Sequence, residues 1–335
     1  MSKRCRDDDD EVANATHLAE KPFSTMSVYT YNGPLCTHFV TAAQAATALP
    51  ALLSAVFGSR KRHSVFSFTA GATGSFLVLD ETLHRELFGG SGSERWSCLY
   101  IHESSSARSG ADVSGSLALL FEHLTHAQVS IINVCTMRRN FVLVRQTMAD
   151  VALQALRSAL DGDGRPSPPP ASDAASFQCQ LTMSSVRIEL LRSSLAIGTL
   201  TLAQLKESAH SILHLLFLRR SDQFVHYFEM GGEISLAISE GPLEALELSE
   251  PESTATLRAA LEPSLSRGWR IFDVTAATGY DGIGILSAVC LPLATLPLMN
   301  FSTLDHTYVL VPEVHLEAAL ELLALNFDVT TEPAP

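Results

Sequence analysis

The stretch VSIINVCTMRRNFVLVRQTMADVALQAL at residues 129–156 recurs as LPLMNFSTLDHTYVLVPEVHLEAALELL at residues 296–323. The two copies align without a gap at a fixed offset of 167 (296 − 129), and eight of their 28 positions are identical. The identical positions include Asn133 and Asn300, Thr136 and Thr303, and a Val-Leu-Val run in each copy. Repetition at a fixed offset indicates that one structural unit occurs twice. The chain is therefore predicted to be internally duplicated.

The repeat extends upstream with a shift of two residues. Gly110-x-Asp112-x-x-Gly115 precedes an apolar helix expected at 117–124, and Gly279-x-Asp281-x-x-Gly284 precedes one expected at 285–293. Trp96 and Trp269, the only tryptophans, each open a strand-like run. The shared order is strand, Gly/Asp loop, helix, strand, turn, strand, helix. That order is typical of a βαββαβ unit with an antiparallel sheet covered by helices on one face.

The early quarters of the chain fit the same unit. Residues 64–81 and 224–240 each contain two apolar runs around a glycine-containing turn, which indicates a hairpin. Helices are expected at 42–57 and 202–218. The predicted fold class is α+β, with four tandem ferredoxin-like βαββαβ modules in two duplicated pairs. The expected boundaries are a disordered tail at 1–25, modules at 26–92 and 93–160, a linker at 161–176, and modules at 177–248 and 264–331.

The composition excludes several classes of function. The 335 residues carry a net charge of −13, so we expect no nucleic acid and no anionic membrane surface as partner. The uncharged stretch 282–299 contains Pro292 and Pro297, which divide it into a buried helix and a strand and argue against a membrane span. No positively charged segment followed by an apolar one opens the chain. We therefore expect no secretory signal and a cytoplasmic location.

Groups that carry chemistry are sparse. The six cysteines form no C-x-x-C pair and lie mostly in apolar runs, which favours reduced, buried thiols. No G-x-x-x-x-G-K-[ST], H-E-x-x-H or G-x-S-x-G motif is present. His210 and His214 have a helical spacing that can ligate zinc, but no third ligand lies at a usual spacing, which favours a packed or surface pair. We therefore expect that the protein is not an enzyme and that it binds neither a metal nor a cofactor.

The repeated Gly-x-Asp-x-x-Gly loop remains as a candidate for binding. Glycines let the backbone turn tightly and approach a ligand. The loop leads into a helix N-terminus, whose free N–H groups suit a carboxylate, and its Asp can accept from an ammonium group. Together these groups can hold an α-amino acid. The alternative is an N-capping Asp with glycines for helix–sheet packing, and the pattern alone leaves both interpretations open.

The same residues resemble a known family. Gly279-Tyr280-Asp281 leading into Gly284-Ile285, followed by Ser302-Thr303 and VLVPE at 309–313, is similar to the ACT-domain proteins, specifically the CASTOR arginine sensors. In the first half of the chain, residues 126–144 are similar to the corresponding segment of the same family. The resemblance is loose over 60–330 and specific mainly in 110–156 and 279–323. It implies four ACT modules, which generally bind amino acids at module interfaces and regulate without chemistry of their own.

The resemblance also implies a ligand site between the second and fourth modules. The matching positions are Ser130 and Ile131 from the second module, and Gly279, Tyr280, Asp281, Gly282, Ile283, Thr303 and Leu304 from the fourth. The family's acidic residue, taken to grip the arginine guanidinium, aligns without a gap to Thr307, which cannot be a charged bidentate acceptor. A two-residue gap would instead bring Asp305-His306 into register with the family's Asp-His. Arginine is therefore one candidate among the amino acids.

Partners are implied in the same way. The resemblance suggests signalling to a GATOR-like partner complex, as in TOR-pathway arginine sensing. The stretch that would hold this partner corresponds to Met137-Arg138-Arg139-Asn140, where an aromatic, an amide and an acidic residue of the family are replaced. A homodimer is left open.

The leading hypothesis is thus a non-catalytic amino-acid-binding sensor. Two alternatives remain, a ligand-free scaffold that binds protein partners and an allosteric ACT subunit of an amino-acid biosynthetic enzyme. Both halves keep the Gly/Asp loop, but only the second keeps Gly-Tyr-Asp and Ser-Thr. We therefore expect one shared site or two unequal ones.

Overall fold

The computed structural model describes residues 26–31, 33–58, 65–71, 74–89, 94–103, 114–136, 139–161, 186–218, 223–230, 233–277 and 283–331. The predicted tail at 1–25 lies outside these ranges, as does the predicted linker beyond Asp161. Residues 137–138 and 279–282, which the sequence marks as functional, also lie outside them.

The two halves of the chain contain matching series of elements. The first half has β1 (Met26–Thr30), β2 (Leu35–Thr41), α1 (Ala45–Phe57), β3 (Val65–Ala70), β4 (Gly74–Asp80), α2 (Glu81–Phe88), β5 (Arg95–Glu103), α3 (Ser114–His126), β6 (Ile131–Cys135), β7 (Asn140–Arg145) and α4 (Ala149–Asp161). The second has β8 (Val186–Thr201), α5 (Leu202–Glu207), α6 (Ala209–Phe217), β9 (Val225–Met230), β10 (Glu233–Ser239), α7 (Glu240–Ser249), α8 (Pro251–Leu261), β11 (Ser266–Ala276), α9 (Ile285–Cys290), β12 (Met299–Ser302), β13 (His306–Pro312), α10 (Leu316–Ala324) and β14 (Val329–Thr331). The predicted alternation of strands and helices is confirmed.

The helices depart from the expected ranges in identifiable places. The helix expected at 202–218 is divided into α5 and α6 at Ser208, and a capping box between Thr201 and Gln204 begins α5. A helix that the pattern did not predict, α8, fills the unassigned residues 249–263 and begins with Pro251 at its first position. Among the described residues, no helix is long and apolar enough to span a bilayer. The uncharged stretch at 282–299 forms α9, a series of turns and the start of β12.

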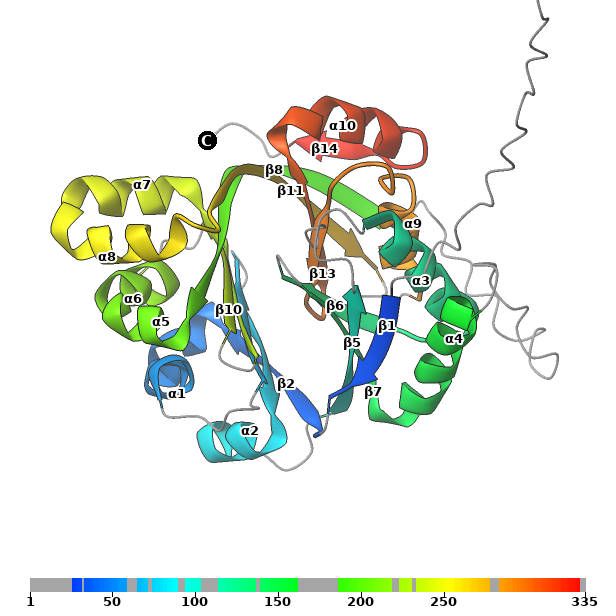
Figure 1. Cartoon of the computed structure of the whole chain (residues 1–335), viewed down its shortest axis with the longest axis horizontal. Helices are drawn as coiled ribbons and strands as arrows, with labels where there is room; N and C mark the ends of the chain where they lie inside the picture. Colours follow the sequence, from blue (N-terminus) through cyan, green and yellow to red (C-terminus); the bar gives the residue numbers. More distant parts are fainter. Residues whose placement is uncertain are drawn as a thin grey trace, which may run out of the picture.

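The strands form one closed sheet, where the sequence predicts four separate ones. Thirteen strands follow the order β1-β5-β2-β4-β3-β9-β10-β8-β11-β13-β12-β6-β7, and β7 pairs again with β5. This last pairing closes a ring of twelve antiparallel strands, with β1 and β14 added outside the ring. Figure 1 shows the helices arranged around the outside of this ring. The helices cover one face of the sheet, as expected. The periodicity of apolar residues does not predict that the sheets of the four quarters join edge to edge.

Strand sharing is what joins the quarters of the chain. In each quarter, the third of its ring strands lies between the first and the second, as in the order β5-β7-β6. A fourth strand, from a neighbouring segment of the chain, pairs with the free edge of the first. Thus β1 pairs with β5, although 26–92 was assigned to a different module from β5. In the second half, β11 pairs with the long strand β8 from Val186 to Ile197, and β10 pairs with the end of β8. The split strand β1/β2 and the continuous strand β8 therefore occupy matching places.

Apolar residues fill both faces of the closed sheet. Two clusters combine strand residues with residues of the helices that cover them, one with α3, α4, α9 and α10 and one with α1, α5, α6, α7 and α8. Two more clusters contain no helical residue and lie on the inner face, around Trp269 and Phe301 in one and around Trp96 and Phe141 in the other. Alternation along a strand accounts for this division, since Trp96 and Cys98 face inward while Leu99 and Ile101 face the helices. Within the described part of the chain, the free cysteines Cys36, Cys98, Cys135 and Cys290 are all buried.

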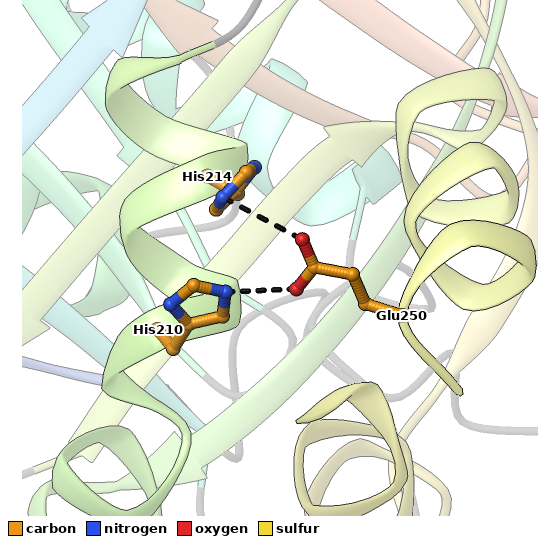
Figure 2. A group of neighbouring side chains, drawn as sticks. All are labelled: His210, His214 and Glu250. Carbon is orange, nitrogen blue, oxygen red and sulfur yellow. Dashed lines mark hydrogen bonds and ion pairs between the residues drawn. The ribbon is translucent and has the colours of Figure 1, made fainter. Parts of the chain in front are cut away.

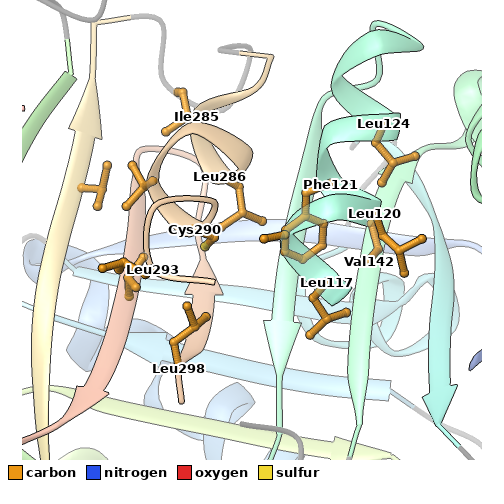
Figure 3. Packing of buried hydrophobic residues seen from close by; sticks show 14 of the residues in the cluster. Leu117, Leu120, Phe121, Leu124, Val142, Ile285, Leu286, Cys290, Leu293 and Leu298 are labelled. Atoms are coloured by element: carbon orange, nitrogen blue, oxygen red, sulfur yellow. The ribbon is translucent and has the colours of Figure 1, made fainter. Parts of the chain in front are cut away.

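The two halves meet along two unequal seams. At one seam, β3 and β9 pair over six residues, from Val65–Met230 to Ala70–Val225. At the other, β6 and β12 share a single pair, Val134 with Phe301. Helices α3 and α9 pack side by side over this second seam, and Figure 3 shows Phe121 of α3 beside Leu286 and Cys290 of α9. The seam is thus held largely by side chains, with little backbone pairing.

A buried amide pair links the two copies of the repeat at this seam. The Asn133 side chain donates from Nδ2 to Oδ1 of Asn300, and the two residues are separated by the repeat offset of 167. Both side chains are buried, with exposed fractions of 0% and 1%. The Asn300 amide also donates to Sγ of Cys290, at 3.9 Å. Identity at this position therefore reflects contact between the copies across the seam.

Asn133→Leu should destabilise the chain by about 1–3 kcal/mol, because it leaves the buried Asn300 amide without its partner. The double variant N133L/N300L should recover part of this loss, since neither position then holds an unpaired amide. Urea unfolding measures both. If the loss of stability in the double variant equals the sum of the two single losses, the amides do not act as a pair.

Candidate functional site

A half-open cavity lies beside the second seam, where the fourth quarter of the chain meets the start of β6. It holds about 410 Å³, counted with the solvent at its mouth. Its walls are the end of β11, the start of α9 and the β12–β13 turn, and Ile131 of β6 faces them from the first half. The lining residues are Ile131, Val274, Ala276, those at 284–286 and those at 302–307.

The β12–β13 turn is shaped by the side chain of Thr303. Its backbone N–H donates to the His306 carbonyl at 2.7 Å, and its Oγ1 accepts from the His306 N–H at 3.0 Å. A longer bond from the Asp305 N–H reaches the same Oγ1 at 3.4 Å. A hydroxyl that bonds to the backbone within a turn fixes the turn's conformation. Thr303 therefore holds Leu304 and Asp305 at the rim of the cavity.

A histidine–carboxylate pair forms one side of the cavity. His306 Nδ1 lies 2.8 Å from Oδ1 and 3.1 Å from Oδ2 of Asp273. The hydrogen bond to Asp273 raises the pKa of His306, the charges of Asp273 and Asp305 act in the same direction, and burial opposes them. The imidazole therefore holds its proton to higher pH than an ordinary histidine. Asp305 itself is exposed at the mouth of the cavity.

The structure brings together five of the eleven site residues suggested by the resemblance. Ile131, Thr303, Leu304, Asp305 and Thr307 line the one cavity. Ser130 and Ile283 are next in sequence to lining residues but do not line it. The remaining four, Gly279, Tyr280, Asp281 and Gly282, lie outside the described residues.

Several lining residues were not among the predicted ones. Val274 and Ala276 end β11, and Leu286 lies in α9. Their apolar patterns indicate core residues, and nothing in the pattern separates a core position from a cavity wall. Asp273 was missed because its role depends on contact with His306, 33 positions away.

The N-capping interpretation of the Gly/Asp loop is not the one seen at α9. The N-cap residue of α9 is Gly284, in a left-handed conformation with φ of 88°, and it makes no side-chain cap hydrogen bond. Glycine adopts this conformation without strain, which explains its place in the motif. Asp281 precedes the cap by three positions. In the first half the same motif leads into α3, which begins at Ser114, so Gly115 is a helical residue there.

The first half contains a turn that matches the one at the cavity. Thr136 donates from its backbone N–H to the Arg139 carbonyl at 2.8 Å, and its Oγ1 accepts from the Arg139 N–H at 2.9 Å. These two residues are the repeat partners of Thr303 and His306. The hollow beside Thr136 holds about 210 Å³ and lies against Phe228, Met230 and Glu233. The two copies of the turn thus border hollows of unequal size.

Two residues of the segment suggested for a GATOR-like partner, Arg139 and Asn140, lie within the described ranges. Residues 137–138 lie outside the described ranges. Asn140 begins β7 and is 3% exposed, paired in the sheet with Cys135 and Ile101. Arg139 is half exposed and lies 4.0 Å from the carboxylate of Glu233. Asn140 cannot contact a partner protein while β7 remains paired.

The two histidines, predicted to be a packed or surface pair, have a carboxylate neighbour that is remote in the sequence. The sequence offers no third ligand for His210 and His214, yet Glu250 lies beside both in the folded chain. It comes from the junction of α7 and α8, 40 residues from His210. This group is distant from the cavity lining and is treated separately below.

Comparison with known proteins identifies one domain. Residues 91–158 match the model of the family described as ACT domain, and this match extends from β5 into α4. The chain therefore contains an ACT domain at these residues, and that domain combines helices and strands. A search among curated proteins finds no match.

Several solved aspartate kinase structures are similar at low identity. The enzyme from Synechocystis aligns with 94% of this chain and 58% of its own length, at 13% identity and a TM-score of 0.33. The ligand-free regulatory subunit of aspartate kinase from Thermus thermophilus aligns with 43% of this chain and 96% of its own length, at 16% identity and a TM-score of 0.30. The Clostridium acetobutylicum enzyme aligns with 52% of this chain and 44% of its own length, at 15% identity and a TM-score of 0.32. This chain thus spans little more than half of the Synechocystis kinase, and likeness at these scores carries no functional conclusion.

Asp273→Asn should lower the pKa of His306, because it removes the charge that favours the imidazolium. Since the folded pKa is raised, the pair stabilises the fold fully below the unfolded value of about 6.5 and loses this effect as pH rises through the folded pKa. The stability difference between wild type and D273N should therefore be largest in mild acid and shrink on the alkaline side. NMR titration of the His306 ring and urea unfolding against pH measure these effects.

The exposed Asp150 of α4 offers a control for this experiment. D150N removes the same charge far from the cavity and should leave the His306 titration unchanged. An equal shift in both variants would mean that overall charge, and not the pair, sets the pKa.

Proposed function

We propose that the chain is a non-catalytic regulatory protein that binds a free amino acid in the cavity at the second seam. The ACT domain at 91–158 supports this, because such domains are typically amino-acid-binding regulators. The observation that carries the proposal is the position of the cavity. It lies where β6 of the ACT domain meets β12, its repeat partner, and both halves contribute to its wall.

The chemistry of the wall suits an amino acid. The Asp305 carboxylate can accept a hydrogen bond from an ammonium group, and the imidazolium of His306, whose pKa is raised, can donate a hydrogen bond to a carboxylate. Ile131, Val274 and Leu304 provide apolar contact for a side chain.

The unequal seams support a single main site. Continuous pairing of β3 with β9 brings the early quarters together through backbone hydrogen bonds. The single pair between β6 and β12 leaves room for a ligand to complete the second seam. The smaller hollow at the matching turn agrees with one shared site or two unequal ones.

The specific form of the proposal is arginine sensing in the TOR pathway, with four ACT modules and the ligand between the second and fourth. The resemblance at Ser302-Thr303 and the exposed carboxylate of Asp305 at the mouth of the cavity support a cationic ligand. A GATOR-like complex is the partner that the resemblance suggests, and the buried Asn140 weighs against the same mode of contact. Arginine is therefore the first ligand to test, and co-purification tests the partner.

Thermal-shift measurement with each free amino acid should identify at least one that stabilises the chain. A ligand that binds only the folded state at 100 times its Kd adds about 2.7 kcal/mol, which raises the midpoint by about 4 °C in a protein of this size. No shift with any amino acid at millimolar concentration would reject the proposal and favour the ligand-free scaffold.

Thr303→Ala should abolish or strongly reduce the shift, because the turn that holds Leu304 and Asp305 loses its hydroxyl. Thr136→Ala is the matched control, since it removes the same bonds from the equivalent turn beside the smaller hollow. It should lower the unliganded midpoint by a similar amount and keep the ligand response. Equal loss of response in both variants would show that general destabilisation, and not the site, is responsible.

Asp281→Ala tests the part of the site that rests on the resemblance alone. A ligand response that disappears in D281A supports the amino-acid sensor. A response that survives in D281A but not in T303A would place the site at the β12–β13 turn without the Gly/Asp loop.

A further inference from the structure

Three side chains that can bind metal converge on the outer helical layer, away from the cavity lining. His210 and His214 are one turn apart on α6, and Glu250 lies at the junction of α7 and α8 (Figure 2). Nε2 of His210 is 2.8 Å from Oε2 of Glu250, and Nε2 of His214 is 4.0 Å from Oε1. One ligand atom from each of the three residues lies within 4.8 Å of the other two.

Each ligand residue is carried by an element that is anchored in the core. On α6, Ile212, Leu215 and Leu216 are buried in the cluster beneath the helices, which leaves His210 and His214 on the outer flank. Leu246 of α7 and Leu257 of α8 are buried in the same cluster. The positions of the three ligands are therefore set by the packing of α6 against α7 and α8.

The backbone of Glu250 is also fixed. Its N–H donates to the Leu246 carbonyl at 2.9 Å, and its own carbonyl accepts from the Thr254 N–H at 3.0 Å. The Thr254 hydroxyl donates to the same carbonyl. The residue thus ends one helix and begins the next, and its side chain extends from a defined point toward the two imidazoles (Figure 2).

The spacing of the ligand atoms suits a small divalent ion. Zinc bonds to imidazole nitrogen and carboxylate oxygen are about 2.0–2.2 Å, so a tetrahedral ion holds its ligand atoms about 3.4 Å apart. The observed separations of 2.8 and 4.0 Å lie on either side of this value, and small side-chain rotations would equalise them. The His210 side chain is 60% exposed and the other two about a third, which leaves an open side for water ligands.

The ligand types select the class of ion. Two imidazoles and one carboxylate with open positions suit zinc and other divalent first-row transition ions, whereas magnesium and calcium prefer oxygen ligands. A bond from one imidazole to Glu250 would satisfy one ring. It does not account for both rings lying beside the one carboxylate, with centroids 4.9 Å apart.

We infer that His210, His214 and Glu250 form a surface site for a divalent transition-metal ion, of which Zn²⁺ is the representative, with water completing the coordination. Such an ion joins α6 to the α7–α8 junction. Because the site shares no residue with the cavity, metal binding and amino-acid binding are separate properties of the chain.

Titration of the full chain with Zn²⁺ against a chromophoric chelator tests the site. Cys5 and Cys179, which lie outside the described residues, are replaced by serine in every sample so that their thiolates do not compete for the ion. We expect one equivalent of Zn²⁺ to bind, with no competition from Mg²⁺ in excess. Each of H210Q, H214Q and E250Q should weaken binding at least about tenfold, since each removes a ligand.

His126→Gln is the matched control, because His126 is an exposed helical histidine that belongs to no such group. It should leave the affinity unchanged. The midpoint of thermal unfolding should rise with Zn²⁺ in the background chain and stay constant in E250Q, and circular dichroism without metal checks that each variant folds. Equal affinity in the background chain and in the triple variant H210Q/H214Q/E250Q would overturn the site. Losses in the two histidine variants but not in E250Q would overturn the three-ligand arrangement.

Discussion

The structure depends on pairing between strands that different quarters of the chain supply to one another. Each quarter contributes three strands and gains a fourth from a neighbour, as when β1 pairs with β5 or the first part of β8 pairs with β11. An unpaired edge exposes backbone N–H and C=O groups, and closure of the ring removes nearly all such edges. No quarter can complete its sheet alone. The helices then cover the outer face, and aromatic side chains such as Trp96 and Phe301 fill the inner one.

Closure also explains why the candidate site is at the second seam. A ring of twelve strands built from two similar halves must be sealed twice, and the two seals differ. Six residue pairs join β3 to β9, whereas α3, α9 and the Asn133–Asn300 pair hold β6 beside β12. Backbone pairing fixes strands at a set distance, and side-chain packing tolerates a gap. The larger of the two hollows described above lies beside this second seam.

The sequence predicts the local structure well and the long-range contacts poorly. Periodicity and the repeat identify the order of strands and helices and the turn at Thr303, because these depend on near neighbours. Closure of the sheet, the pairing of Asp273 with His306 and the approach of Glu250 to His210 depend on residues that are 33 or more positions apart. Alternation shows that a strand has two faces but not which strand lies beside it. The sequence therefore points to site residues that belong to the repeat or to the resemblance, such as Thr303. It does not point to residues that only the packing of the chain brings together, such as Asp273 and Glu250.

The way in which the two halves share the cavity determines what a ligand can regulate. A ligand shifts an equilibrium only by its difference in affinity for the two states, so it must contact elements that move relative to one another. Among the described residues, Ile131 is the lining residue from the first half, and the others belong to the fourth quarter. Ile131 begins β6, which pairs along its length with β7, and β7 in turn pairs with β5. Under the proposed function, a ligand that contacts both the β12–β13 turn and Ile131 would therefore stabilise the arrangement in which the second seam is closed.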